Sequence, residues 1–154
     1  MTAHDTVAYR VWPPFAIGAP LIVGLLLTSS RGDPIALGDW RTPLGWLLVG
    51  VFIVVNGWAL LVFALHETGL LPGQPTEALI EQGPYRVSRN PLYVGLLALY
   101  LGLALLAPSV WALALFPVAV SLILWGAIVP EERYLHERLG TPYDDYARRV
   151  RRWL

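Results

Sequence analysis

Residues 90–130, NPLYVGLLALYLGLALLAPSVWALALFPVAVSLILWGAIVP, form a run of 41 residues without a charged side chain. A helix needs roughly 20 predominantly apolar residues to cross the hydrocarbon core of a bilayer. The run is therefore long enough for two crossings, and Pro108-Ser109 near its middle is typical of a tight turn. The stretch predicts a helical hairpin in a membrane, with spans over 91–107 and 110–129.

Two further charge-free runs lie upstream, between Arg10 and Arg31 and between Arg41 and Glu67. They predict spans over 11–28 and 43–65. Only 14% of the 154 residues are charged, against about 25% in soluble domains. We expect an all-α integral membrane bundle of about four transmembrane helices in a single membrane domain. It comprises two N-terminal spans (1–65) and a loop, hairpin and tail (66–154), with no cleaved signal peptide.

Composition excludes several classes of chemistry. The formal net charge is zero, so no overall field attracts nucleic acid. The chain has no cysteine and no lysine, which excludes thiol nucleophiles, thiolate metal sites and Schiff-base mechanisms. His4, His66 and His136 do not have the spacing of metal ligands, so we expect no metal site.

The arginines predict the orientation in the membrane. Arg31 and Arg41 fall on one side of a four-span arrangement, and all the other arginines fall on the opposite side. The side richer in basic residues is normally cytoplasmic. Both termini and the loop 66–90 should therefore face the cytoplasm. The charged tail 130–154 predicts amphipathic helices, which either lie on the lipid headgroups or cap the bundle.

Two polar features interrupt the apolar pattern: the segment 83–95, GPYRVSRNPLYVG, before the third span, and Glu131-Glu132 after the fourth. Arginines and tyrosines at such places are also typical of simple membrane-interface anchors. However, a hairpin would bring Arg89-Asn90 and Glu131-Glu132 to the same membrane face. A guanidinium, an amide and two carboxylates in one pocket could hold a zwitterionic, partly aromatic ligand.

The order of these motifs resembles a known family. Gly-Pro-Tyr-Arg-x-x-Arg-Asn-Pro-Leu-Tyr-x-Gly precedes Glu-Glu-x-x-Leu-x-x-x-x-Gly-x-x-Tyr-x-x-Tyr-x-x-x-Val. This arrangement is similar to the isoprenylcysteine carboxyl methyltransferases and their phospholipid N-methyltransferase relatives, including bacterial members. The resemblance covers residues 66–153. It implies a cofactor, S-adenosylmethionine, which is a zwitterion with an adenine ring.

The resemblance also implies roles for individual residues. Arg89, Asn90 and Glu132 are its candidate catalytic residues. Many family members have histidine in place of Asn90, and an amide does not titrate, so no general base is assigned. The implied cofactor contacts are Leu79, Ile80 and Tyr85 at the nucleoside, Asn90, Pro91, Leu92 and Tyr93 at the methionine half, Glu131 and Glu132 at the ammonium, and Arg89 at a position where the family also has arginine.

The implied activity is methyl transfer to a lipophilic acceptor at the cytoplasmic face of a bacterial inner membrane. The resemblance does not identify the acceptor, which could be a phospholipid amine, a small lipophilic thiol, or an isoprenoid or quinone-like acid or alcohol. It also leaves open whether O-, N- or S-methylation takes place. The small size of the bundle is compatible with a monomeric protein. Two alternatives stay open. One is a sterol-reductase-like enzyme that uses NADPH, because those enzymes share a related Arg-x-Pro-x-Tyr element. The other is a non-enzymatic membrane scaffold.

Overall fold

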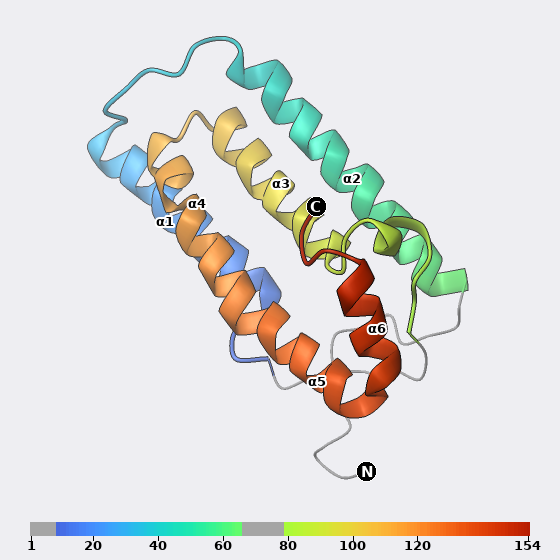
Figure 1. The fold of residues 1–154 in the computed structure, drawn as a ribbon. Coiled ribbons are helices and arrows are strands. Elements are labelled where there is room, and N and C mark those ends of the chain that lie inside the picture. Colours follow the sequence, from blue (N-terminus) through green and yellow to red (C-terminus); the bar gives the residue numbers. More distant parts are fainter. Residues whose placement is uncertain (1–8, 66–78) are drawn as a thin grey trace.

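A computed structural model describes residues 9–65 and 79–154 of the chain (Figure 1). The described residues form helices and no strand. The elements are α1 (Pro13–Arg31), α2 (Arg41–Leu65), the 3-10 turn η1 (Gly83–Arg86), α3 (Pro91–Leu106), α4 (Val110–Ile123), the π-helical turn η2 (Leu124–Ile128), α5 (Val129–Leu139) and α6 (Thr141–Arg149). Most of the predicted loop, 66–78, lies outside the described residues.

The expected membrane bundle is confirmed. Helices α1 and α2 and the continuous helix Val110–Leu139 are each long and apolar enough to cross a membrane, while α3 is apolar but only 16 residues long. Large apolar side chains cover the outer surface of α2, where bilayer lipid would meet them. Strongly exposed examples are Trp46, Leu47, Ile53, Val54 and Leu65.

The helices pack in two pairs, α2 against α3 and α1 against α4, and the hairpin turn joins the pairs (Figure 1). Ser109 in that turn is fully buried and caps α4, because its hydroxyl accepts a bond of 3.0 Å from the Ala112 amide. The same hydroxyl lies 2.7 Å from the Thr28 hydroxyl of α1. The predicted turn is thus held by polar contacts to a neighbouring helix.

The helix of the predicted fourth span continues past residue 129 into the first helix of the tail. Pro130 has no amide hydrogen and cannot donate to the carbonyl of Gly126 four residues earlier. Instead of breaking, the helix widens into η2 and continues as α5. The Gly126 carbonyl then accepts from the backbone amides of Arg10 and Val11, at 3.0 and 3.3 Å. The proline therefore creates the acceptor to which the segment before α1 is bound.

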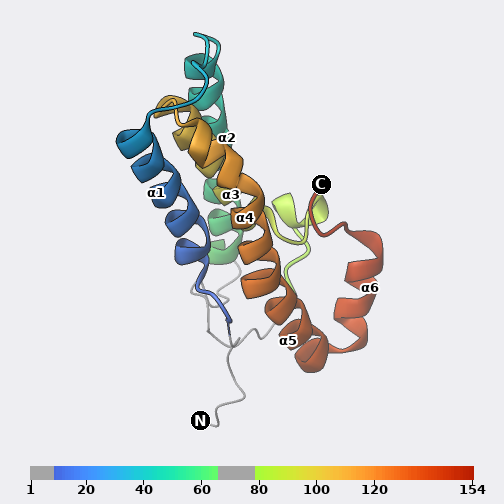
Figure 2. The ribbon, with the colours of Figure 1, turned by 90° about the vertical axis from the view of Figure 1, so that its left-hand side faces the viewer.

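The tail is the predicted pair of helices, and Gly140 separates them. Gly140 adopts a φ of 61°, a conformation that favours glycine, and the chain reverses there. The two helices are joined across this turn by His136 and Asp144, whose side chains lie 2.7 Å apart. Figure 2 shows α6 folded back beside the bundle. Because Tyr143 and Tyr146 are buried, the structure favours the reading of α6 as a cap on the bundle.

Candidate functional site

A cavity of about 90 Å³ lies where η1, α5 and α6 meet. Most of the residues proposed from the sequence line it, so the two polar motifs share one cavity. Typical small-molecule sites measure about 300–1,000 Å³, which means that a cofactor-sized ligand would require the walls to move apart. The predicted residues that line the cavity are Leu79, Ile80, Tyr85, Arg89, Asn90, Glu131 and Glu132.

Three predicted residues lie outside the cavity wall. Pro91 is the first residue of α3, where its fixed φ suits a helix start. Leu92 packs against a buried cluster that contains Ile80 and Tyr85. Tyr93 does not line the cavity, but its hydroxyl donates to Glu131, which does. Sequence reasoning missed four residues that do line the cavity, namely Phe63, Leu135, Tyr143 and Tyr146.

One wall of the cavity is apolar. Phe63 at the end of α2 meets Tyr85 edge to face, with ring centroids 5.4 Å apart. Ile80 is buried in the same cluster, beside Val62 and Ala59 of α2. An aromatic ligand ring could stack against this wall, because the packed side chains give the wall a fixed shape.

Arg89 provides the main positive charge of the cavity. Its side chain is 15% exposed, and one terminal nitrogen, Nη1, lies 3.2 Å from Glu132 Oε1 and 3.5 Å from the Tyr143 hydroxyl. Its Nε is buried and has no acceptor among the described residues. A buried donor without a partner costs about 1–3 kcal/mol. The guanidinium thus offers a free donor to an incoming acceptor, such as a ligand carboxylate.

The two adjacent glutamates differ in their environment. Glu132 is neutralised by Arg89 and by Arg152, which donates two bonds to its carboxylate, of 3.0 and 2.7 Å. Glu131 instead accepts a bond of 2.9 Å from the Tyr93 hydroxyl and forms no ion pair within the described part of the chain. The two carboxylates, for which the resemblance implies one shared role at the cofactor ammonium, thus differ in that only Glu132 has charged partners among the described residues.

The segment after α6 packs along the wall of the cavity. The Arg89 amide donates to the Arg151 carbonyl at 2.9 Å, and the Asn90 side-chain amide donates to the Arg152 carbonyl at 3.0 Å. Ser88 contacts the same Arg152 carbonyl at 3.3 Å. The side-chain donor of Asn90 is thus occupied in holding the C-terminal segment.

The phenol of Tyr146 joins α6 to η1 beside the cavity. Tyr146 donates a bond of 2.8 Å to the carbonyl of Tyr85. Burial raises the pKa of both Tyr85 and Tyr146 above the usual value for tyrosine. Both phenols therefore stay protonated at neutral pH, where they act as hydrogen-bond donors and do not serve as bases.

The comparisons with known proteins agree with this geometry. The family model described as phospholipid methyltransferase matches residues 40–141, about two thirds of the chain. The chain belongs to the phospholipid methyltransferase family. The matched range begins just before α2 and ends at the first residue of α6, so it contains η1 and α5 and most of the cavity lining. The resemblance drawn from the two motifs is confirmed.

Two curated bacterial relatives of this phospholipid methyltransferase family member are similar along most of the chain. One is the cobalt-zinc-cadmium resistance protein CzcN of Cupriavidus metallidurans, 30% identical over 97% of this chain and 63% of its own length. The other is the nickel-cobalt-cadmium resistance protein NccN of Alcaligenes xylosoxydans xylosoxydans, 28% identical over 88% of this chain and 69% of its own length. The chain thus spans about two thirds of each relative. No solved structure matches it.

Proposed function

We propose that this protein transfers a methyl group from S-adenosylmethionine to a lipophilic acceptor at the surface of a membrane. One observation carries the proposal. The cavity combines a buried Arg89 Nε without an acceptor and a Glu131 carboxylate without an ion-pair partner among the described residues. These two groups are complementary to the carboxylate and the ammonium of an amino acid, and the family membership favours methyl transfer over NADPH-dependent reduction or a scaffold role.

The chemical groups that line the cavity match those of the cofactor, which would enter once the walls have moved apart. Arg89 would bind the cofactor carboxylate, Glu131 its ammonium, and the wall of Phe63, Ile80 and Tyr85 its adenine ring. When bound, S-adenosylmethionine supplies a methyl group attached to a sulfonium, which is displaced in line by a nucleophile. The protein then needs chiefly to position the two reactants and to exclude water.

No residue of the cavity is proposed as a general base. Asn90 does not titrate, and its amide is bound to the Arg152 carbonyl. Glu132 lies between two guanidinium groups, and its ion pairs with Arg89 and Arg152 occupy its oxygens. The proposed roles are therefore binding and orientation, with Glu132 fixing Arg89 against the cavity.

We also propose a cytoplasmic location for the cavity and both termini, in a bacterial inner membrane. The support is the excess of arginine at the end of the bundle that carries η1 and α5. The names of the two relatives refer to resistance to heavy metals. Since no group of three or more potential metal ligands comes together in the described residues, we do not extend metal binding to this chain.

Calorimetric titration of the detergent-purified protein with S-adenosylhomocysteine, and separately with NADPH, tests the proposal. We expect micromolar binding of S-adenosylhomocysteine and none of NADPH. Glu131→Gln should weaken binding at least tenfold, because it removes the one cavity carboxylate that has no ion-pair partner among the described residues. Glu137→Gln is the matched control, since Glu137 is an exposed carboxylate of the same helix.

Each other result has a defined meaning. Binding of NADPH in place of S-adenosylhomocysteine would show that the reaction class is wrong. Equal loss of affinity in Glu131→Gln and Glu137→Gln would show that Glu131 does not contact the ligand. Binding of neither compound would remove the support for methyl transfer.

A further inference from the structure

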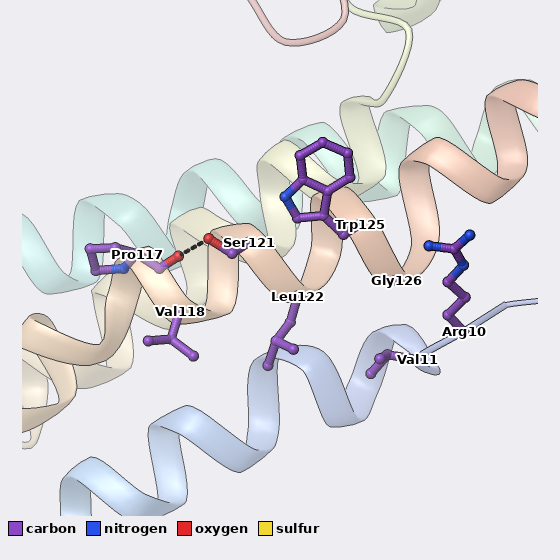
Figure 3. Close-up of a pocket in the computed structure, with 8 residues that line it drawn as sticks. All are labelled: Arg10, Val11, Pro117, Val118, Ser121, Leu122, Trp125 and Gly126. Atoms are coloured by element: carbon purple, nitrogen blue, oxygen red, sulfur yellow. Dashed lines mark hydrogen bonds between the residues drawn. The ribbon is translucent and has the colours of Figure 1, made fainter.

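A second concave surface lies on the outside of the bundle, in a groove between the segment before α1 (Arg10 and Val11) and the helix formed by α4 and η2. Its volume is about 450 Å³, and it shares no lining residue with the cavity of the candidate site. Figure 3 shows Val118 and Leu122 pointing from α4 toward α1, with Pro117 at one end of the groove and Arg10 at the other. The groove opens on the side of the bundle where bilayer lipid would surround it.

The lining is apolar except for a single cation. Pro117, Val118, Leu122, Trp125 and Val11 supply most of its surface, and the hydroxyl of Ser121 is bound to the Pro117 carbonyl at 2.8 Å. The guanidinium of Arg10 forms no ion pair in the described part of the chain. A groove of this kind therefore has a hydrocarbon-like body and one positively charged end.

The position of Arg10 is fixed by the backbone. Its amide donates to the Gly126 carbonyl at 3.0 Å, the carbonyl that Pro130 leaves free in η2. A side chain at position 126 would place its Cβ 2.7 Å from Val11 Cβ, so the close approach of this segment requires glycine. π-helical turns of this kind are frequent at functional sites. Here the turn holds a guanidinium against the end of an apolar groove.

We propose that this groove binds a phospholipid of the surrounding membrane, with one acyl chain along the exposed face of α4 and η2 and the phosphate at Arg10. An acyl chain matches the apolar lining, and guanidinium groups bind phosphate oxygens through two parallel hydrogen bonds. The site goes beyond the proposed methyl transfer, because none of its residues belongs to the cavity and it requires no cofactor.

A second surface groove on α1 provides an internal comparison. It measures about 420 Å³, and its lining, which includes Phe15, Gly18 and Ile22, contains no charged residue. If apolar shape alone were sufficient, the two grooves would bind lipid equally. If the phosphate is recognised, only the groove with Arg10 retains a phospholipid in detergent solution.

Trp125 lines the groove and is 60% exposed, so it can report binding. Bromine atoms on an acyl chain quench tryptophan emission at contact. Phosphatidylglycerol with brominated chains is titrated into the full-length protein in detergent, without cofactor, and the signal that disappears in Trp125→Phe is assigned to the groove. We expect saturable quenching, and at least fivefold weaker binding of a diacylglycerol with the same chains, because it lacks the phosphate.

Three variants and two controls complete the test. Arg10→Gln should weaken phosphatidylglycerol binding at least fivefold, Arg10→Lys should weaken it less, and Val118→Phe should weaken both lipids by filling the groove. Arg31→Gln and Gly18→Leu should leave binding unchanged, because the first removes an arginine at the other end of α1 and the second fills the cation-free groove.

The backbone bonds of Arg10 do not depend on its side chain, so Arg10→Gln should fold normally. Quenching without saturation would overturn the proposal, since it indicates contact with bulk lipid only. Equal affinity for the two lipids, or unchanged affinity in Arg10→Gln, would overturn the role of the phosphate. Because S-adenosylhomocysteine is absent, these results are independent of whether the proposed methyl transfer is correct.

Discussion

The side chains of Arg152 and Glu132 form a two-bond ion pair, with Nε 3.0 Å from Oε1 and Nη2 2.7 Å from Oε2. The pair joins the segment after α6 to the start of α5. Arg89 reaches the same carboxylate from the segment before α3, at 3.2 Å. One glutamate thus connects three parts of the chain that are distant in sequence, and its charge is already balanced before any ligand binds.

The two arginines should differ in their effect on cofactor binding. Arg89 lines the cavity, whereas Arg152 contacts Glu132 from outside and its side chain is 42% exposed. We expect Arg89→Gln to weaken S-adenosylhomocysteine binding at least tenfold in calorimetry and Arg152→Gln to weaken it less than threefold. Equal effects would place Arg152 among the binding residues and contradict the description of the cavity.

The hydroxyl of Tyr93 orients the free carboxylate of the site. Tyr93→Phe removes the bond of 2.9 Å to Glu131, and hydrogen bonds to charged groups contribute about 1.5–3 kcal/mol. We expect about tenfold weaker binding of S-adenosylhomocysteine, because Glu131 is no longer held toward the ligand. In the double variant with Glu131→Gln, the tyrosine substitution should have little further effect. Independent, additive losses would show that Tyr93 acts elsewhere.

Tyr146 and Tyr100 offer a matched pair of phenols. Each donates a bond of 2.8 Å to a backbone carbonyl, Tyr146 to Tyr85 beside the cavity and Tyr100 to Ala112 within the bundle. Substitution of either by phenylalanine should lower the free energy of unfolding by about 1 kcal/mol. Only Tyr146→Phe should also weaken binding of S-adenosylhomocysteine. A loss of affinity in Tyr100→Phe would mean that the effect reflects general destabilisation.

Two glycines of α1 should respond oppositely to alanine. A Cβ at Gly24 would lie 2.4 Å from Ala112 Cα of α4, and backbone cannot move aside easily, so Gly24→Ala should cost about 1–3 kcal/mol. A Cβ at Gly18 meets nothing within 4 Å, so Gly18→Ala should stabilise the helix by up to about 1 kcal/mol. Thermal unfolding in detergent measures both. A lower Tm for Gly18→Ala would contradict the packing described here.

Much of the fold could be predicted because membrane spans are determined by local composition. The charge-free runs place α1 to α4 within a few residues of the observed helices, since a charged side chain is costly in the bilayer. The meeting of Arg89 and Glu131 also followed from the sequence, because a two-span hairpin returns its ends to the same face.

Other features depend on how the tail folds back, which no local pattern determines. The ion pair of Arg152, and the positions of Tyr143 and Tyr146 in the cavity wall, require the chain reversal at Gly140 and the docking of α6 on η1. The different partners of Glu131 and Glu132 likewise could not be predicted from the sequence. They arise because the helix turns one carboxylate toward Tyr93 and the other toward two arginines.

The carbonyl that Pro130 leaves free has a consequence for biogenesis. Arg10 and Val11 are synthesised more than a hundred residues before Gly126, their hydrogen-bond acceptor. Helix α1 is therefore synthesised before α4. The surface of α1 that packs against α4 stays without this partner until α4 has been synthesised and inserted. Assembly of α1 against α4 is thus a late event, and a nascent chain arrested before residue 126 would contain α1 without the partner that fixes its N-terminal end.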